Sequence, residues 1–376
     1  MKTLTHEKEY KVGLPELPTQ SEFNAYLSTI WSEKIVTNFG PIHNSLEENL
    51  SKYLEVDNVV LFASGTSALE ALLSMYNTSS RVVIPSFSFD ATLTAVRRNN
   101  MQLGFVDVNV SDGTFETKSL RARPSAINSD LLLGVHCYGF PCNVSEMQEL
   151  NLPTIFDAAH SMGSKLDGKH LATYGDASVL SLHATKIFSA VEGGAVITSD
   201  ENLAHELRKY RYFGIDRGNH SEMHSGRGTN AKMSELHAAI GLLQLKKFEE
   251  ILYRRKEIFL EYRKKLCGFT GLRLMQPSHE ESINGSYVPI SLDSLKVKRE
   301  KLIDFLRNEG IFTKPYFDKN LALLADDQKY EGCFSNTDLL VQSVMCLPIH
   351  SEMTFHDVGY ICDKIEKFLT EYDYEE

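Results

Sequence analysis

Short apolar runs alternate with helical patterns through the first part of the chain. The runs are rich in Val, Ile, Leu and Phe and are bounded by turn residues, which is typical of buried strands. They cover Val59–Ala63, Val82–Pro85, Leu103–Asp107, Leu131–His136, Thr154–Asp157, Ala177–Leu182 and Gly194–Thr198. Helical patterns lie between several of them, at Ser67–Met75, Thr92–Asn99 and Leu203–Tyr212. Apolar strands that alternate with helices predict an α/β fold with a largely parallel sheet covered on both faces.

The rest of the chain has a different pattern. Met233, Leu236, Ile240 and Leu243 mark one apolar face of a long helix that continues to about Leu266. Beyond it we expect strands at Tyr287–Leu292 and Ile311–Tyr316 and helices at Lys298–Glu309 and Val358–Tyr372. A chain of 376 residues is too long for one ordinary core. We therefore predict a large α/β domain over residues 1–245 and a smaller C-terminal α+β domain over residues 246–376.

Composition narrows the class of protein. The apolar share of 42% and the charged share of 24% are those of a soluble globular protein. No apolar run approaches the roughly 20 residues of a membrane helix, and the N-terminal MKTLTHEKEY lacks the apolar core of a signal peptide. The net charge of −11 argues against a nucleic-acid partner. Six cysteines without a CxxC pair suggest no metal site and a cytoplasmic protein with free thiols.

Two strand ends carry candidate ligand-binding groups. Small residues from Ala63 to Ser67 follow one predicted strand and open a helix, where free backbone N–H groups could bind an anion. The alternative is an ordinary helix cap made by Thr66 or Ser67. Asp157 closes another strand, at the edge where α/β sheets bind ligands, and its carboxylate could hold a pyridinium N–H. A capping role is the alternative for Asp157 as well.

Lys186 is the candidate nucleophile. It follows the strand end Ser181-Leu-His-Ala-Thr, and the pair Gly193-Gly194 opens the next strand. A lysine that attacks an aldehyde must be partly desolvated, because only the neutral amine reacts. A lone lysine is otherwise a surface charge. Phe87 and Phe89 follow a further strand, where an aromatic ring could stack on a planar cofactor, although core packing is the better interpretation for Phe87.

These groups together match the needs of one cofactor. An anion cup, a carboxylate, a lysine and an aromatic ring at the carboxyl ends of predicted strands are what pyridoxal 5'-phosphate (PLP) requires. A nicotinamide cofactor is disfavoured, because no GxGxxG sequence opens a helix after any predicted strand. The polar, Gly-rich stretch Gly214–Gly228 is long enough to suggest a functional loop.

The chain resembles the DegT/DnrJ/EryC1/StrS family of sugar aminotransferases from about Ser28 to the C-terminus. Seven motifs carry the resemblance in order: Thr37–Pro41, Ser64–Leu69, Pro85–Phe89, Asp157–His160, Ser181–Lys186, Glu192–Gly194 and Gly228–Met233. The resemblance implies the fold type I of PLP-dependent transferases, similar to aspartate aminotransferase, with a large seven-stranded, mainly parallel sheet. It also implies a homodimer with the active site at the subunit interface.

The resemblance also implies roles for single residues. Lys186 would form the Schiff base and move protons, Asp157 would pair with the pyridine nitrogen, Phe89 would stack on the ring, and His160 would lie near the ring hydroxyl. The phosphate ligands would be Gly65, Thr66, Ser67 and Ser181, with Asn230 reaching the phosphate from the neighbouring subunit. Phe39, Tyr316, Lys232 and His350 would lie near the substrate.

Some positions depart from the commoner family pattern. His160 stands where many members have Gln, and Lys232 stands where Arg is frequent. These differences bear on substrate detail. Dehydratase relatives replace the Schiff-base lysine with His, so Lys186 favours transamination over dehydration.

The implied reaction is a ping-pong transamination in which L-glutamate gives its amino group and leaves as 2-oxoglutarate, and a nucleotide-linked keto sugar accepts the group. The expected acceptor is dTDP-4-dehydro-6-deoxy-D-glucose, which would give dTDP-4-amino-4,6-dideoxy-D-glucose for a bacterial surface polysaccharide such as the O-antigen of lipopolysaccharide. A 3-keto sugar or a UDP- or GDP-linked sugar is the alternative within the same class. A regulatory protein that kept the fold without turnover is the alternative of another class.

Overall fold

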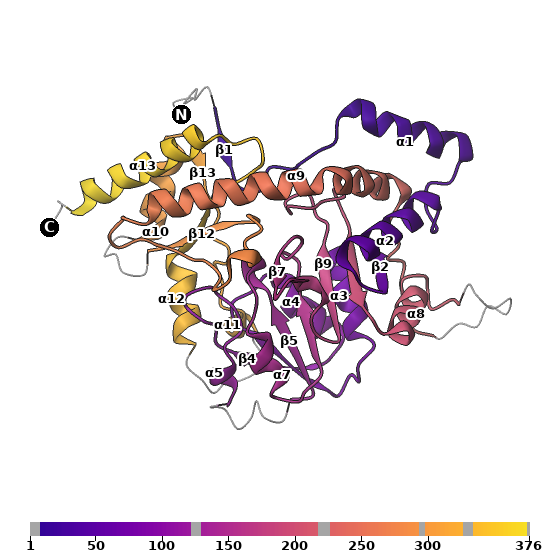
Figure 1. Ribbon diagram of the computed structural model, residues 1–376. Coiled ribbons are helices and arrows are strands. Elements are labelled where there is room, and N and C mark those ends of the chain that lie inside the picture. Colours follow the sequence, from indigo (N-terminus) through magenta and orange to yellow (C-terminus); the bar gives the residue numbers. More distant parts are fainter. Residues whose placement is uncertain (1–7, 122–128, 217–225, 293–297, 326–333, 374–376) are drawn as a thin grey trace.

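The computed structural model describes residues 8–121, 129–216, 226–292, 298–325 and 334–373, and a seven-stranded sheet organises its larger part (Figure 1). The strand order is β2-β10-β9-β6-β5-β3-β4. Their bounds are β2 Asn58–Phe62, β3 Arg81–Pro85, β4 Gln102–Val106, β5 Leu131–Val135, β6 Thr154–Asp157, β9 Ala177–Ser181 and β10 Gly194–Thr198. Only β10 runs antiparallel to its neighbours. The predicted α/β fold with a largely parallel sheet is confirmed, and each of the seven strands predicted for this sheet begins and ends within one residue of the observed bounds.

Helices cover both faces of this sheet because the strand side chains alternate between them. Val60 and Phe62 of β2 belong to one apolar cluster, together with side chains from the helices α3 (Gly65–Leu73), α4 (Asp90–Arg98) and α8 (Glu201–Tyr210). Val59 and Leu61 point to the opposite cluster, which includes side chains of α2 (Pro41–Leu54) and α9 (Glu235–Leu266). The continuous apolar runs in the sequence reflect this burial on both faces.

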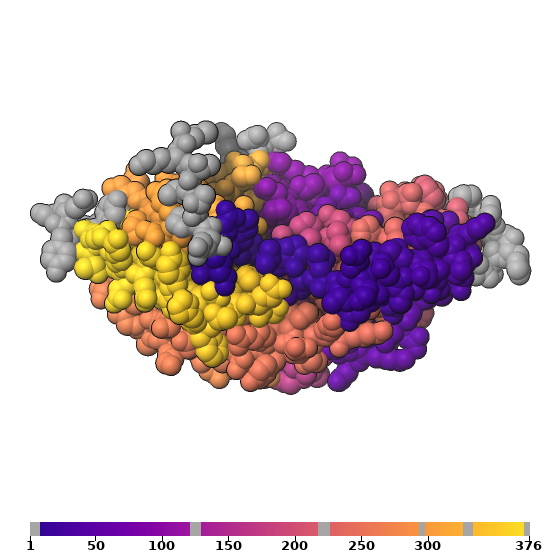
Figure 2. Space-filling model, turned by 90° about the horizontal axis from the view of Figure 1, so that it is seen from above, coloured from indigo at the N-terminus to yellow at the C-terminus, as the bar shows by residue number. Residues whose placement is uncertain are grey.

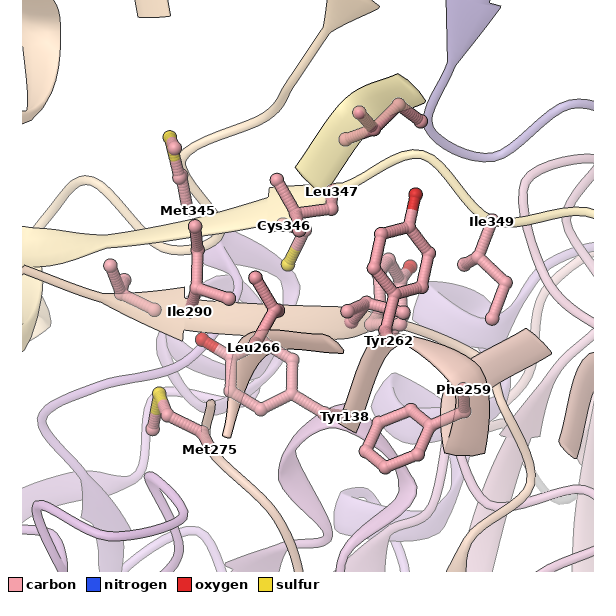
Figure 3. Close-up of a cluster of buried hydrophobic side chains, with 14 of the residues drawn as sticks. Tyr138, Phe259, Tyr262, Leu266, Met275, Ile290, Met345, Cys346, Leu347 and Ile349 are labelled. Carbon is pink, nitrogen blue, oxygen red and sulfur yellow. The ribbon is translucent and has the colours of Figure 1, made fainter. Parts of the chain in front are cut away.

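Helix α9 runs from the large sheet to the C-terminal part (Figure 1). There the three-stranded antiparallel sheet β11-β12-β14 packs against its second half. Figure 3 shows Tyr262 and Leu266 of α9 beside Ile290 of β12 and Leu347 of β14. The Tyr262 hydroxyl donates to the Pro348 carbonyl at 2.9 Å. The elements here are β11 Arg273–Leu274, β12 Val288–Ser291, β14 Val344–Leu347, α10 Arg299–Asn308, α11 Leu321–Leu324, α12 Ser335–Ser343 and α13 Phe355–Asp373.

The predicted boundary between residues 245 and 246 lies inside α9 and stays a prediction. The expected strand Ile311–Tyr316 is wrong in its extent, because β13 covers only Ile311–Phe312. β13 pairs in parallel with β1 (Tyr10–Lys11). Pro315 has no N–H to continue a ladder, and Lys314 instead bridges to Cys346. The chain then carries Tyr316 toward the large sheet.

The N-terminal helices were not expected from the sequence. Helix α1 (Gln20–Glu33) begins with a capping box between Thr19 and Glu22. Figure 2 shows the N-terminal segment and the C-terminal helix α13 on one face of the molecule, over the long helix α9. Trp31 in α1 is 65% exposed, and Ile35 and Val36 after it are also exposed. Shorter elements complete the described chain: α5 Thr117–Arg121, α7 Val144–Gln148, β7 Lys165–Leu166, β8 Lys169–His170 and the 3₁₀ turns Cys137–Gly139, Leu171–Thr173 and Glu280–Ser282.

Within the described ranges, none of the helices combines the length and the apolarity that crossing a bilayer requires.

Candidate active site

A cavity of about 270 Å³ opens where several strands of the large sheet end. Asp157 closes β6 and Ser181 closes β9, and the segments that follow β2, β3 and β5 complete the wall. Ligands bind at this edge of open α/β sheets. Most of the residues predicted for the site lie in this wall: Gly65, Thr66, Phe89, Asp157, His160, Ser181, Lys186 and Tyr316. The fold therefore gathers residues that are as much as 251 positions apart, from Gly65 to Tyr316, around one space.

The turn before α3 acts both as a helix cap and as part of the cavity wall. The Ser64 hydroxyl accepts a hydrogen bond from the Ser67 N–H at 3.1 Å, and the Ser67 hydroxyl donates back to the Ser64 carbonyl at 2.9 Å. Gly65 and Thr66 line the cavity at the first turn, where N–H groups have no acceptor inside the helix. The Ser67 side chain is engaged in the cap and is not in the wall, so its role as a phosphate ligand stays a prediction.

Strand β10 passes very close to this turn. A Cβ atom on Gly194 would lie 2.4 Å from the Ser64 carbonyl oxygen and 2.5 Å from the Gly65 nitrogen. Only glycine lets the strand approach the backbone of the turn so closely. The Gly193-Gly194 pair thus fixes the position of the anion cup against the sheet.

Asp157 is a buried carboxylate with a hydrogen-bond donor on each oxygen. Oδ1 accepts from the Ala159 N–H at 3.1 Å, and Oδ2 accepts from the Thr92 hydroxyl at 3.0 Å. Burial raises the pKa of Asp157, and these two donors and the Lys186 charge oppose that rise. The Asp157 carboxylate can therefore accept a hydrogen bond from a protonated nitrogen placed against it.

Lys186 extends into the same cavity from the loop between β9 and β10. Its Nζ lies 3.4 Å from the Tyr287 hydroxyl. Burial lowers the pKa of Lys186 to about 8, although the Asp157 charge acts in the opposite direction. A lysine with this pKa supplies a useful fraction of neutral amine near pH 7, which a surface lysine does not.

His160 presents one ring nitrogen to the cavity. Its Nδ1 accepts from the Tyr138 N–H at 3.1 Å, so the neutral ring carries its proton on Nε2. Burial, with the charge of Lys186, holds the pKa of His160 well below its usual range. Its ring centroid lies 4.7 Å from that of Tyr287. His160 is therefore a neutral hydrogen-bond donor at the cavity wall.

The two phenylalanines after β3 divide as expected. Phe87 is fully buried and packs edge-on against Phe317, with ring centroids 5.2 Å apart. Phe89 is 55% exposed and lines the cavity, and its stacking on a cofactor ring stays a prediction.

Besides Ser67, four predicted residues lie outside the cavity wall of this chain. Asn230 accepts a hydrogen bond from Lys232 at 2.5 Å. Phe39 packs edge-on against Tyr212, and His350 lies near the Glu16 charge. The roles predicted for Asn230, Lys232, Phe39 and His350 stay predictions. Most of the predicted loop Gly214–Gly228, positions 217–225, falls outside the described residues.

The cavity also contains residues that sequence reasoning did not select. Tyr287 opens a predicted strand but is 101 positions from Lys186, so nothing local in the sequence joins them. His136 follows β5, and the strand-end rule that selected Asp157 could have found it. The His136 ring stacks on Phe156 at 4.3 Å, and its Nδ1 accepts from the Cys142 N–H. Its Nε2 has no hydrogen-bond partner among the described residues.

The residues present fit PLP. The first turn of α3 suits a phosphate, Asp157 suits a ring nitrogen, Lys186 suits an aldehyde, and the unpaired Nε2 of His136 lies in the wall of the same cavity. No group of three or more His, Cys, Asp or Glu side chains in the described part of the chain is placed to hold a metal ion.

Comparisons with known proteins show which family the chain resembles. The DegT/DnrJ/EryC1/StrS aminotransferase family matches residues 18–366. A dTDP-4-amino-4,6-dideoxy-D-glucose transaminase from Shigella dysenteriae is 35% identical over 96% of this chain and 99% of its own length. A second dTDP-4-amino-4,6-dideoxy-D-glucose transaminase, from Escherichia coli, is 32% identical over 93% of this chain and 95% of its own length. The crystal structure of DesI with its TDP-sugar product superposes with a TM-score of 0.89 at 28% identity, covering 98% of this chain and 94% of that one.

Proposed function

The chain belongs to the DegT/DnrJ/EryC1/StrS aminotransferase family, and from this premise we propose that it forms dTDP-4-amino-4,6-dideoxy-D-glucose. It is a PLP-dependent sugar aminotransferase. The proposed amino donor is L-glutamate, and the proposed acceptor is dTDP-4-dehydro-6-deoxy-D-glucose. Two transaminases of that description, which match nearly the whole chain, support this choice of sugar.

The observation that carries the proposal is the presence of Lys186 and Asp157 in one cavity. When bound, PLP supplies an aldehyde that joins the amine of a substrate and a ring that withdraws electrons from it. Lys186 supplies the neutral amine that anchors this aldehyde. With the amino donor bound, its Nζ would take the proton from the donor's α-carbon. In the second half-reaction the same atom returns a proton to the carbon of the sugar.

Other residues of the cavity would bind and orient the cofactor. Asp157 would hold a proton on the ring nitrogen, because a carboxylate stabilises the cation beside it. The N–H groups of Gly65 and Thr66 and the Ser181 hydroxyl would hold the phosphate. His160, neutral and protonated on Nε2, would donate to the ring hydroxyl oxygen. Phe89 would cover the ring.

The proposal includes a homodimer in which Asn230 completes the phosphate site of the partner. Asn230 lies outside the cavity of its own chain, and α1 and the segment after it expose the apolar side chains Trp31, Ile35 and Val36. Such a patch suits a contact with a second copy. A role in surface polysaccharide synthesis and a cytoplasmic location are further parts of the proposal. The free thiols of the five cysteines in the described chain suit a reducing compartment.

A panel of nucleotide keto sugars tests the proposal. The enzyme with PLP and L-glutamate is incubated with dTDP-linked 4-keto and 3-keto sugars and with UDP- and GDP-linked 4-keto sugars, and products are identified by mass spectrometry and NMR. We expect the dTDP-linked 4-keto sugar to give the highest kcat/KM. Lys186→Ala should abolish turnover, because no neutral amine remains at the reacting carbon.

Three results would each contradict a different part of the proposal. A higher kcat/KM with a UDP- or GDP-linked sugar or a 3-keto sugar would overturn the choice of acceptor and keep the reaction class. Absence of any absorbance change of the bound cofactor on addition of glutamate would overturn the choice of amino donor. Full activity of Lys186→Ala would overturn the assignment of the nucleophile.

A further inference from the structure

Asp157 receives its second hydrogen bond from a helix that was not expected to take part in the site. Thr92 lies in the first turn of α4, and its side chain is fully buried. The Thr92 hydroxyl lies 3.0 Å from Asp157 Oδ2 and 2.8 Å from the Ser88 hydroxyl, which is 2% exposed. These three buried groups form a continuous chain that ends on the carboxylate.

The direction of this chain follows from the chemistry of its members. An ionised carboxylate only accepts, so Thr92 gives its single hydroxyl proton to Asp157. The Thr92 oxygen can then accept only, and the Ser88 hydroxyl donates to it. Because Thr is β-branched, its side chain has few rotamers in a helix, and the Ser88 contact fixes it further. A donor held from both sides gives a charge-assisted hydrogen bond, which is stronger than a neutral one.

The first turn of α4 connects this chain to the rest of the site. The Thr92 N–H donates to the Phe89 carbonyl at 3.1 Å. The same turn therefore places Phe89 in the cavity wall and Thr92 against Asp157. The start of α4 thus positions both the Phe89 ring and the hydroxyl that contacts Asp157.

We propose that Thr92, held by Ser88, is a positioning residue that keeps the Asp157 carboxylate ionised and in place for the pyridine nitrogen. This inference rests on the proposed pairing of Asp157 with that nitrogen. Without the Thr92 hydroxyl, a buried carboxylate keeps only the Ala159 N–H, and its ionised form becomes less favourable. The proton shared by the pair then moves from the ring toward the carboxylate, and the ring withdraws electrons less strongly.

A second Ser–Thr–Asp chain elsewhere in the molecule provides a matched control. The Ser86 hydroxyl lies 2.7 Å from the Thr337 hydroxyl, which donates to Asp107 Oδ1 at 2.7 Å. Both hydroxyl groups are fully buried, and Asp107 is 4% exposed. None of these three residues lines the cavity. The Ser86 hydroxyl also donates to the Val106 carbonyl at 3.0 Å, and Asp107 accepts from further N–H groups. Thr337→Val therefore removes a buried hydrogen bond between Thr and Asp outside the cavity wall.

The test compares Thr92→Val, Thr92→Ser and Thr337→Val. In the apoprotein, ¹³C NMR of labelled aspartate follows the Asp157 carboxyl, assigned with Asp157→Asn, as pH is varied. We expect Thr92→Val to raise the pKa of Asp157, Thr92→Ser to restore it, and Thr337→Val to leave it unchanged. The Lys186 charge also lowers the pKa of Asp157. Each variant is therefore measured again in a Lys186→Met background, where this charge is absent.

The holoenzyme gives a second readout. With ¹⁵N-labelled PLP, the ring-nitrogen signal of Thr92→Val should move toward that of neutral pyridine, and kcat should fall on the order of tenfold with KM for glutamate little changed, because a hydrogen bond to a charged group is lost. Thr92→Ser should recover both.

Two outcomes would overturn the inference: an Asp157 pKa that does not change in Thr92→Val, or a ring-nitrogen signal that moves equally in Thr337→Val. Failure of the proposed pairing looks different. In that case Asp157→Asn itself would leave the ring-nitrogen signal unchanged, while the apoprotein titration would still respond to Thr92.

Discussion

Lys186 and Asp157 are brought toward their neutral forms by the same physical cause. Burial disfavours a charge of either sign, so it lowers the pKa of Lys186 to about 8 and raises that of Asp157. Their mutual attraction opposes both changes. Lys186 can therefore lose or gain a proton near neutral pH, as a residue that moves protons must.

The pH dependence of Lys186 reactivity follows from this balance. Only the neutral amine reacts, so labelling of Lys186 in the apoprotein by acetic anhydride should increase with pH and reach half its maximum near pH 8. Asp157→Asn removes a negative charge that raises this pKa, so the midpoint should move to lower pH. Mass spectrometry of the Lys186 peptide measures both. A midpoint at the ordinary lysine value of about 10.4 would contradict the account.

The Tyr287 hydroxyl lies within hydrogen-bond distance of the Lys186 amine. Its Oη is 3.4 Å from Nζ, and its ring is buried. Tyr287→Phe should keep the packing and lower kcat several-fold, because a neutral hydrogen bond contributes about 1 kcal/mol. If Tyr287 steadies the amine during proton transfer, the kinetic isotope effect with α-deuterated glutamate should increase.

Tyr262 gives the control for this substitution. Its hydroxyl is also buried but bonds to the Pro348 carbonyl in the C-terminal part. Tyr262→Phe should lower the free energy of unfolding and leave the isotope effect unchanged. Equal isotope effects in Tyr287→Phe and the wild type would exclude a role for Tyr287 in the proton transfer.

At the scale of elements, the site depends on how β10 packs against the start of α3. The two elements lie in contact because Gly194 has no side chain. The loop between β9 and β10 carries Lys186, so a displacement of β10 moves both the anion cup and the nucleophile. The position of one strand thus sets two functional groups.

Gly194→Ala tests this dependence. A methyl group there would meet the Ser64 carbonyl at 2.4 Å, and backbone atoms must shift to relieve the contact. We expect a loss of about 1–3 kcal/mol in the free energy of unfolding and weaker PLP binding. Urea unfolding and a fluorescence titration with PLP measure the two effects. Gly268→Ala is the control, because no atom outside its chain neighbours lies within 4 Å of a Cβ at that position. Unchanged PLP affinity in Gly194→Ala would contradict the account.

At the scale of the whole molecule, one helix joins two differently built parts. Helix α9 packs on the large sheet with its first half and on the three-stranded sheet with its second half. Tyr287 belongs to the segment that leads into β12, and Tyr316 follows β13, yet both line the cavity of the large sheet. The C-terminal part therefore closes the site as well as stabilising the fold.

Mixed dimers test the proposed sharing of the site between subunits. Chains with Lys186→Ala and chains with Asn230→Ala are co-expressed with different affinity tags, and mixed dimers are isolated. If Asn230 serves the partner, each mixed dimer has one site with both residues intact and should show about half of the wild-type activity. Each variant homodimer should have lost most of its activity. If Asn230 acted within its own chain, both sites of the mixed dimer would be damaged and it would be as inactive as its parents.

The pattern of apolar residues was enough to predict the seven strands of the large sheet and their succession along the chain. Each strand there is a largely apolar run, because both faces of the sheet are covered and side chains that point either way are buried. The strand-end rule then located Asp157, and the small-residue turns located Gly65 and Lys186. Residues at the same sheet edge must lie close together, so these positions could be predicted without knowing any long-range contact.

Contacts between segments that are distant in the chain appear only in the folded structure. The hydrogen bond from Thr92 to Asp157, the placement of Tyr287 beside Lys186 and the short extent of β13 leave no periodic signal in the sequence. The pKa of Lys186 is likewise a property of its burial, which the residue types around it in the chain do not define. Local sequence patterns indicate which residues lie at a strand end. The contacts of these residues and the extent of their burial depend on the packing of the whole fold.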